Sequence, residues 1–327
     1  MHPDDAREPL LDVRGDARLI LFPIQHPDIW TMYKKMVASL WTNEEIDYTQ
    51  DIVDWNTRLT DAERHFISYV LAFFASSDAI IMENLCANFA SEVAYPEARM
   101  VYAAQQFFES IHAEGYGLII DTLVKDRAEK ERLFTAIATI PSVGRKAKWA
   151  QKWISAESSF ATRLVAFAVV EGIMFSASFC AIFWLKTRGL LPGLAFLNAL
   201  ISRDEGMHVE FAVLLYTRHI KHRLETDAIH RLVDEAVEIE LEFVRDALDV
   251  RTIGMNATLM TEYVRYVADH LLVSLGHPKL YNARMVFDFM HNISVSNKSN
   301  FFETRVSEYQ LGAIAGGTRE FTLDESF

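Results

Sequence analysis

Two stretches of the sequence place a glutamate three residues before a histidine within apolar surroundings. Glu109 and His112 lie in "FESIHAEGY", and Glu205 and His208 lie in "SRDEGMHVEFA". Residues three apart on a helix share a face, so each pair would point one carboxylate and one imidazole the same way. Mixed carboxylate and imidazole ligands suit iron or manganese, whereas zinc usually takes fewer oxygens. The two pairs are therefore candidate metal ligands.

Two further carboxylates lie in segments where an ionised group is costly to bury. Asp78 is in "LAFFASSDAII" and Glu171 is in "LVAFAVVEGIMFSASFCAIFWL", and neither segment contains a basic residue. Burying an unpaired carboxylate costs several kcal/mol. A lysine or arginine from elsewhere in the chain would compensate this charge, and so would a bound metal cation.

The order of these residues along the chain favours the metal. Asp78 precedes Glu109 by 31 residues and Glu171 precedes Glu205 by 34, each time one helix and a turn earlier. About one Glu-x-x-His match is expected by chance, so chance acids beside core histidines are the alternative interpretation. A duplicated helix pair would instead supply four carboxylates and two histidines, the ligand set of ferritin-like di-iron and di-manganese bundles.

Several neighbours of these residues could take part in the same chemistry. Tyr116 follows His112 by one turn on the same face, close enough to exchange an electron with an oxidised metal. Asp204 could accept a hydrogen bond from a ligand histidine or cap a helix turn. Phe175 and Phe179 share the face of Glu171 and would line a dry pocket. A role in the core alone is the competing reading for the three aromatic residues.

The elements that must position these residues are helices. Apolar residues recur at helical spacing and alternating strand patterns are hard to find, so the sequence predicts an all-α fold. A capping box at Thr60–Glu63 opens one helix. The predicted helices cover about 28–40, 60–90, 96–123, 126–138, 145–155, 158–189, 193–219, 225–250, 257–274 and 280–290. We expect an N-terminal segment over 1–27, one helical domain over 28–291 and a tail over 292–327.

Composition limits the function classes. The chain has 327 residues, is 50% hydrophobic and carries a formal charge of −13, which disfavours a nucleic-acid partner. Its two cysteines, Cys86 and Cys180, indicate no disulfide framework, and the acidic N-terminus is unlike a signal peptide, so we expect a cytoplasmic protein. A membrane span over Leu164–Leu185 is the alternative to a central bundle helix, but Glu171 facing lipid would be costly. We expect no membrane association.

Taken in order, the motifs resemble those of one family. The chain is similar to the small, radical-generating subunit of class I ribonucleotide reductase, most of all the eukaryotic and viral type. The similarity covers nearly the whole chain, through "FPIQHPDIWTMYKKMVASLWTNEEID", "FFASSDAIIMENL", "FESIHAEGY", "VVEGIMFSASF", "SRDEGMHVEFA", "NKSNFFETRVSEYQ" and "FTLDESF". The resemblance implies a ferritin-like helical bundle with a dinuclear metal site, a homodimer, and a large catalytic subunit as partner.

The resemblance also implies a role for each matching residue. It implies two iron ions per chain in a di-iron-oxo centre, with manganese possible, on ligands Asp78, Glu109 and His112 for one metal and Glu171, Glu205 and His208 for the other. Tyr116 matches the radical tyrosine, while Trp41, with Asp204 and His112, matches the link from the metals to the surface. The remaining matches are Tyr309 as the tail relay, Phe321, Leu323 and Phe327 as tail anchors, and Phe175, Phe179 and Ile201 as an apolar pocket.

The resulting hypothesis is a subunit that activates dioxygen, forms a tyrosyl radical and passes it to the large subunit, which reduces ribonucleotides. The chain has no Gly-rich phosphate loop ending in lysine and no dithiol, so we expect no direct nucleotide substrate. Two alternatives remain: a stand-alone di-iron oxygenase, which would not need the C-terminal peptide, and an iron-storage or structural relative, which would not need Tyr116.

Overall fold

The computed structural model describes most of the chain up to residue 290. The described residues are 2, 4–12, 15, 18, 20–154, 158–248 and 255–290, without the side chains of 78–80, 82–84, 86, 87, 247 and 248. Residues Met1–Phe287 form one compact unit, to which the elements below belong. The predicted tail residues Tyr309, Phe321, Leu323 and Phe327 lie outside the described residues.

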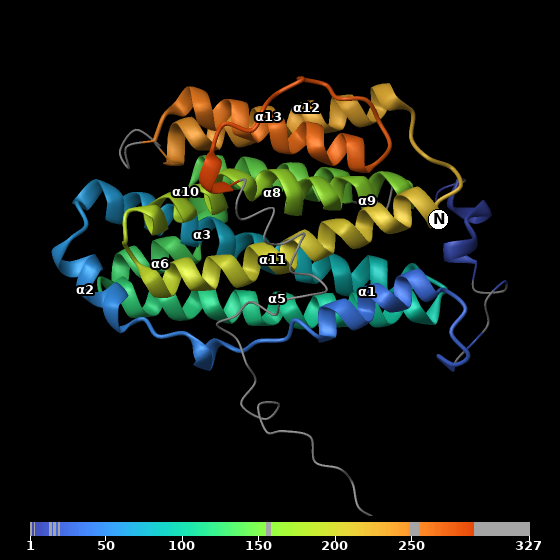
Figure 1. The fold of residues 1–327 in the computed structure, drawn as a ribbon, viewed down its shortest axis with the longest axis horizontal. Helices are drawn as coiled ribbons and strands as arrows, with labels where there is room; N and C mark the ends of the chain where they lie inside the picture. Colours follow the sequence, from blue (N-terminus) through green and yellow to red (C-terminus); the bar gives the residue numbers. More distant parts are fainter. Residues whose placement is uncertain are drawn as a thin grey trace, which may run out of the picture. The chain divides into compact units, whose positions relative to one another are not determined.

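The predicted all-α fold is confirmed, since the described residues form helices and no strand (Figure 1). The longer helices are α1 (Pro27–Val37), α3 (Asp61–Asn84), α5 (Pro96–Leu123), α8 (Pro141–Ile154), α9 (Phe160–Val169), α10 (Ser176–Thr187), α11 (Pro192–Leu214), α12 (Thr226–Phe243) and α13 (Ala257–Ser274). Shorter ones are η1 (Asp5–Arg7), η2 (Pro9–Leu11), η3 (Asn43–Glu45), α2 (Thr49–Thr57), α4 (Ala90–Glu92), α6 (Arg127–Phe134) and α7 (Ala136–Thr139).

Four wide, π-type segments directly continue long helices. They are η4 (Leu85–Phe89) after α3, η5 (Val170–Met174) after α9, η6 (Leu215–His219) after α11 and η7 (Val244–Leu248) after α12. Such segments hold an extra residue per turn and are frequent at functional sites. Only η5 contains one of the predicted metal ligands, Glu171.

The bundle is built from neighbouring helix pairs. Helix α5 packs against α3 and α1, α11 packs against α9 and α10, and α12 packs against α8 and α13. Figure 1 shows α5 and α11 running side by side through the centre of the view, with α12 and α13 along one edge. The four helical segments predicted to carry the metal ligands are therefore adjacent: α3, α5, η5 and α11.

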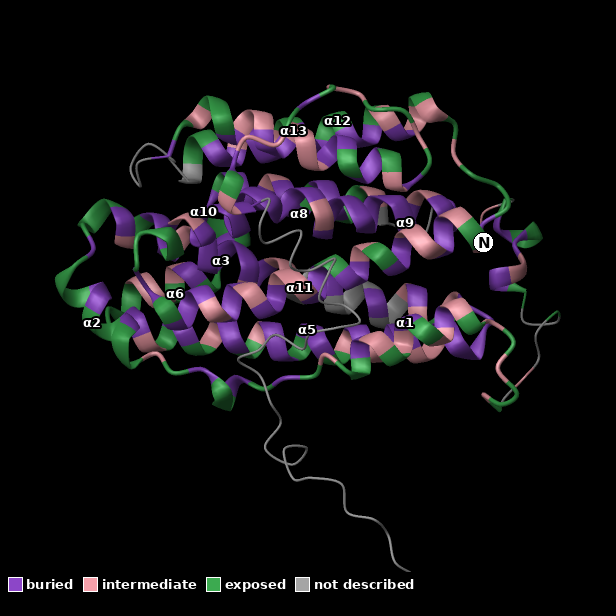
Figure 2. Cartoon of the chain, viewed as in Figure 1, coloured by how far each residue is buried: buried purple, intermediate pink, exposed green. Residues whose placement is uncertain are grey.

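The apolar stretch Phe160–Thr187 is a core element. It is long and apolar enough to cross a membrane, but 94% of its most apolar window is buried inside the structure. Every residue of α9 except Thr162 is buried, and the segment is mainly purple in Figure 2. The segment is therefore the central helix of the bundle, as the sequence predicted.

The local sequence signals have mixed outcomes. The capping box is confirmed, because the Glu63 N–H donates to Thr60 Oγ1 at 3.2 Å and the Thr60 N–H donates to Glu63 Oε2 at 2.8 Å. The single helix predicted over 158–189 is wrong in one respect, since η5 widens it and Phe175 interrupts it. The helix predicted over 126–138 is divided into α6 and α7 at Thr135.

Two other helix assignments differ from the structure. The helix predicted over 280–290 is wrong for residues 280–287, where the Asp269 carboxylate accepts hydrogen bonds from the Leu280, Tyr281 and Ala283 N–H groups. Asn282 adopts a φ of 53°, which is incompatible with a right-handed helix. Conversely, the short helix α2 was not predicted from the sequence.

Helix α2 fixes the start of α11. Leu191, with φ of 50°, ends the preceding turn, and its N–H donates to Asp54 at 2.9 Å. The N–H groups of Gly193 and Leu194 donate to Asp51 at 2.8 and 2.7 Å. Carboxylates at a helix N-terminus satisfy free N–H groups and favour the helix dipole. The caps therefore set the register of the helix that presents Asp204, Glu205 and His208.

Candidate metal centre

Three elements converge to form a buried acidic cluster. Helix α5 supplies Glu109 and His112, η5 supplies Glu171, and α11 supplies Glu205 and His208. Ligating atoms of Glu109, Glu171, Glu205 and His208 all lie within 4.8 Å of one another. Asp78 belongs to α3, which packs against α5, but its side chain lies outside the described residues.

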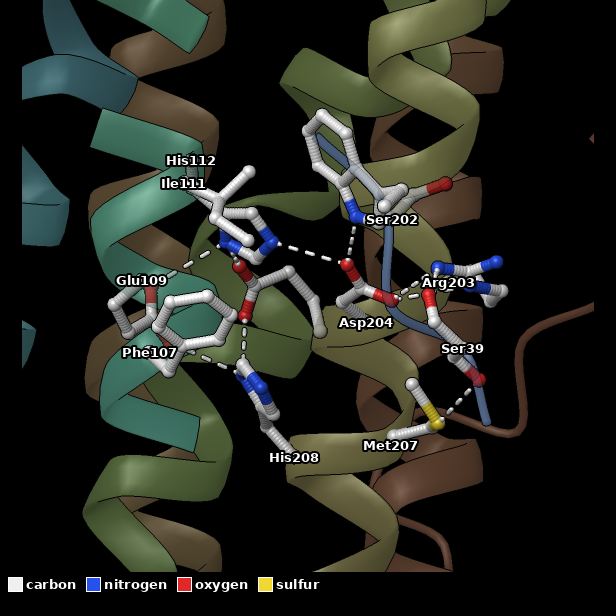
Figure 3. Close-up of polar contacts among 12 residues, drawn as sticks. Ser39, Phe107, Glu109, Ile111, His112, Ser202, Arg203, Asp204, Met207 and His208 are labelled. Atoms are coloured by element: carbon white, nitrogen blue, oxygen red, sulfur yellow. Dashed lines mark hydrogen bonds and ion pairs between the residues drawn. The ribbon is translucent and has the colours of Figure 1, made fainter. Parts of the chain in front are cut away.

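Both imidazoles turn Nδ1 toward the carboxylates (Figure 3). Nδ1 of His208 lies 3.1 Å from Glu109 and 3.2 Å from Glu205. Nδ1 of His112 lies 3.1 Å from Glu205 and 3.5 Å from Glu109. Glu171 lies 3.6 Å from His208 Nδ1. Because Glu109 and Glu205 each reach both imidazoles, these two carboxylates occupy the space between them.

The electrostatics of the cluster show what balances its charge. Burial raises the pKa of Glu109, but the close contacts and positive charge of His112 and His208 outweigh burial and lower its pKa to about 2. Burial raises the pKa of Glu171 well above its ordinary value. Burial lowers the pKa of both imidazoles, but the carboxylates outweigh this and raise both values. These pKa shifts favour protons on Glu171 and on the two imidazoles when no metal is bound, and metal cations would replace those protons.

Several oxygen and nitrogen atoms of the cluster make no hydrogen bond and are therefore available to bind metal ions. Within the described residues, both carboxylate oxygens of Glu109, Nδ1 of His112, Oε2 of Glu171 and Oε1 of Glu205 are buried without a hydrogen-bond partner. Buried polar atoms are rarely left in this state. Five oxygen and nitrogen atoms aimed at one region match the ligand chemistry of iron or manganese. The residues that are present therefore fit a metal centre.

One ligand candidate connects the cluster to its surroundings. His112 Nε2 lies 3.2 Å from Asp204 Oδ2, and the same oxygen accepts a hydrogen bond from Trp41 Nε1 at 2.7 Å. The Trp41 and His112 rings are roughly parallel, with centroids 6.1 Å apart. All three side chains are fully buried. The contacts among His112, Asp204 and Trp41, which the resemblance implied, are thus present in the structure.

The aromatic residues predicted near the metals gather around Phe74. Its ring stacks on Tyr116 with centroids 4.8 Å apart and on Phe179 at 4.9 Å, and it meets Phe175 edge-on at 5.6 Å. Tyr116 is 1% exposed, so its ring is shielded from water. Ile201 is buried on α11, one turn before Glu205.

Sequence reasoning missed two polar residues that contact the site. Gln105 is buried on α5 and donates from Nε2 to Glu171 Oε1 at 3.2 Å. Arg203 donates to Asp204 Oδ1 at 2.8 Å and to the Ser39 carbonyl at 2.7 Å. Gln105 lies one turn before Glu109 on the same helix face, a spacing that could have identified it. Arg203 directly precedes Asp204, but only the fold brings it to Ser39.

The comparisons with known proteins agree with this geometry. Residues 18–287 match the family model described as "Ribonucleotide reductase, small chain". A ribonucleoside-diphosphate reductase small chain from Trypanosoma brucei brucei is 54% identical over 99% of this chain and 96% of its own length. This chain belongs to the ribonucleotide reductase small-chain family.

A second relative and one solved structure support the same assignment, and a more distant structure shares the fold. A Nicotiana tabacum small chain is also 54% identical, over 98% of both chains. The structure of the Saccharomyces cerevisiae Rnr4 homodimer has a TM-score of 0.80 and 36% identity, covering 89% of this chain and 92% of that one. The dimanganese(II)-NrdF structure from Streptococcus sanguinis shares the fold, with a TM-score of 0.74, 21% identity, and coverage of 84% and 98%.

Proposed function

We propose that this small chain holds two metal ions, uses them with dioxygen to oxidise Tyr116 to a radical, and passes the oxidising equivalent to a large catalytic subunit. That subunit would then reduce ribonucleotides to deoxyribonucleotides in the cytoplasm. The observation that carries the proposal is the buried carboxylate and histidine cluster, joined through His112 and Asp204 to Trp41. Membership of the family supplies the reaction.

Iron is the metal we propose, with manganese as the alternative. Asp78, Glu109 and His112 would hold one ion, and Glu171, Glu205 and His208 the other. Reduced iron with dioxygen supplies an oxidant strong enough to remove an electron and a proton from a tyrosine. Glu109 and Glu205 approach both imidazoles, so their carboxylates lie between the two sets of residues that would hold the ions.

The protein around the cluster would protect and direct the radical. Tyr116 lies one turn after His112 on α5 and is buried, with Phe74 stacked on its ring. Phe175 and Phe179 pack on Phe74 in turn, so this aromatic cluster would keep water from the tyrosine. Asp204 accepts hydrogen bonds from Trp41 and His112 at one oxygen, so a proton can shift along this line as an electron passes. Arg203 fixes the other oxygen of Asp204.

The partner contacts would come from the tail. Tyr309 would relay the radical across the interface, and Phe321, Leu323 and Phe327 would insert into the large subunit as apolar anchors. The acidic "FTLDESF" sequence offers these three apolar side chains within seven residues. We further propose that the small chain works as a homodimer, since a related protein with 36% identity forms one.

Turnover with a large subunit tests this assignment. We expect Tyr309→Phe to remove ribonucleotide reduction while leaving the Tyr116 radical and the metal content unchanged, because the hydroxyl is needed only for transfer. Deletion of residues 321–327 should weaken subunit binding and leave the radical intact. Undiminished turnover in both variants would refute the proposed transfer to a partner. The substitution Tyr33→Phe, in α1, is a control that should behave as the unmodified protein.

A further inference from the structure

The helix that carries Glu171 is interrupted four residues after it. Segment η5 ends at Met174, Phe175 adopts φ −97° and ψ −14°, and α10 begins at Ser176. A break of this kind places the carbonyl end of one helix beside the N–H end of the next. Both ends expose backbone groups that need partners from outside the helix.

Two buried charges from other helices satisfy the two ends of the break. Lys146 of α8 donates from Nζ to the Met174 carbonyl at 2.7 Å. Glu240 of α12 accepts a hydrogen bond from the Ala177 N–H at 3.3 Å. A cation thus lies at the carbonyl end and an anion at the N–H end, as the helix dipole favours. Lys146 and Glu240 also form a direct ion pair with each other.

The pair lies in an unusually enclosed place for charged residues. The Lys146 side chain is 2% exposed and that of Glu240 is fully buried. The ammonium group sits 3.7 Å from the Phe73 ring centroid and 3.8 Å from that of Phe243. Burial lowers the pKa of Lys146 to about 8 and raises that of Glu240, although each opposes the shift of the other. The fold retains these charges despite the cost of desolvating them.

Stability alone does not account for this arrangement. Well-packed apolar residues often replace a buried ion pair with no loss of stability, so such a pair is weak evidence for a stabilising role. Lys146 and Glu240 have a more specific effect, since their backbone contacts bracket Phe175. Met174, on one side of the break, is three positions after Glu171. Phe175 itself packs against Phe73 and Phe74.

We propose that Lys146 and Glu240 are positioning residues for the metal centre. Through the Met174 carbonyl and the Ala177 N–H they fix the break in the helix, and the break sets the direction in which Glu171 enters the carboxylate cluster. The inference rests on the metal centre proposed above, but it concerns one ligand only. It assigns Lys146 and Glu240 no contact with the metals, with dioxygen or with Tyr116.

Charge-neutral double variants test the proposal, because a single substitution would leave an unpaired buried charge. Lys146→Met with Glu240→Gln removes the donor to Met174 and keeps an oxygen acceptor for Ala177. Lys146→Met with Glu240→Leu removes both backbone contacts. The matched control is Arg18→Met with Glu97→Gln, which removes another ion pair, of 2.9 Å, that lies on the N-terminal segment and α5.

The main measurement is Mn²⁺ binding to the metal-free full-length protein, monitored through the electron paramagnetic resonance signal of free Mn²⁺. The midpoint temperature of thermal unfolding is measured on the same variants. Residues that support metal ligands typically change affinity by about 10- to 100-fold. We expect the weaker of two Mn²⁺ sites to lose about tenfold in affinity in the variant with Glu240→Gln. The variant with Glu240→Leu should lose more. The control should bind as the unmodified protein.

The outcomes separate this proposal from the proposed function. Unchanged Mn²⁺ affinity in both double variants would overturn the positioning role, and so would a loss that the control shares. Failure of both neutral pairs to fold would also overturn it, by making the pair a requirement of the fold itself. If the unmodified protein binds two Mn²⁺ ions but forms no radical with iron, the proposed function fails while the positioning role is still supported by the affinity differences.

Discussion

The two halves of the proposed metal centre share a pattern of candidate ligands but differ in the helices that carry it. In the first half, α3 runs unbroken through Asp78, and α5 carries Glu109 and His112. In the second half, the helix with Glu171 widens at the ligand itself and breaks four residues later, while α11 carries Glu205 and His208. A duplicated sequence pattern therefore does not imply duplicated local structure.

The two histidines differ in a corresponding way. Nε2 of His112 contacts Asp204, which continues to Trp41, whereas Nε2 of His208 has no hydrogen-bond partner among the described residues. Polar contacts thus connect the first half to Asp204 and Trp41, outside the set of candidate ligands. The second half is defined by backbone geometry and by the contacts of Gln105 and of the Lys146–Glu240 pair. We infer that the first half conducts the electron and proton that pass between the metals and the large subunit. The second half sets the position of the candidate ligand Glu171.

The largest expected effect comes from breaking the outward connection of the first half. Asp204→Asn keeps the side-chain shape, but the amide can no longer accept from Trp41 and His112 at a charged oxygen. We expect turnover with the large subunit to fall by about 10²- to 10⁴-fold, the range typical of a lost proton-transfer group. Metal content and radical yield should change less than twofold, roughly the scatter of a neutral substitution.

The control for this prediction is a second Asp–His contact. Asp28 lies in the first turn of α1, away from the cluster, and its carboxylate is 3.1 Å from His219 Nε2. Asp28→Asn should leave turnover unchanged. If Asp204→Asn were as active as this control, the first half would not be the conducting one and the comparison of the two halves would fail.

A smaller effect is expected from the polar contact of the second half. Gln105→Leu removes the donor to Glu171 without adding charge, so the carboxylate loses one of its fixed partners. We expect metal affinity, measured by titration of the metal-free protein, to fall about 10- to 100-fold. Fully loaded protein should turn over almost normally, since the outward connection is intact. Lost turnover at full metal loading would show that Gln105 belongs to the conducting path instead.

The smallest effect concerns the tight contact between α5 and the segment after Trp41. A Cβ at Gly115 would lie 2.7 Å from Asn43 Oδ1 and 3.0 Å from Leu197. Asn43 cannot retreat freely, because its amide donates to the Ile111 carbonyl at 2.9 Å. Gly115→Ala should therefore lower the free energy of unfolding by about 1–3 kcal/mol, measured with urea.

Two other glycines serve as comparisons for the predicted loss of stability in Gly115→Ala. Gly117→Ala, on the same helix with nothing within 4 Å, should raise stability by up to about 1 kcal/mol. At Gly172, in the widened segment of the second half, a Cβ would meet Val209 at an ordinary 3.4 Å. Equal stability for the Gly115 and Gly117 variants would contradict the close approach described for the first half.

The sequence predicted the features that depend on local pattern. Helical periodicity, the capping box at Thr60 and the two Glu-x-x-His pairs depend on residues within one helix, and the structure contains all of them. The break at Phe175 was not predicted, because "GIMFSASF" contains no proline, and its one glycine lies three residues before the break. Tertiary contacts from Lys146 and Glu240, distant in sequence, stabilise that break.

The same limit applies to other missed elements. Helix α2 has the weak amphipathic sequence "TQDIVDWNT", and its role in capping α11 depends on residues about 140 positions away. Arg203 and Gln105 are ordinary polar residues in a helix until the fold brings them to Asp204 and Glu171. Long-range contacts of this kind leave no periodic signal in a single sequence.

The most direct test of the central claim is an electron paramagnetic resonance spectrum of the iron-loaded protein after exposure to air, with metal content measured on the same sample. The account predicts two irons per chain and a tyrosyl signal that disappears in Tyr116→Phe while both irons are retained. Two irons without an organic radical, or a radical that survives in Tyr116→Phe, would contradict it.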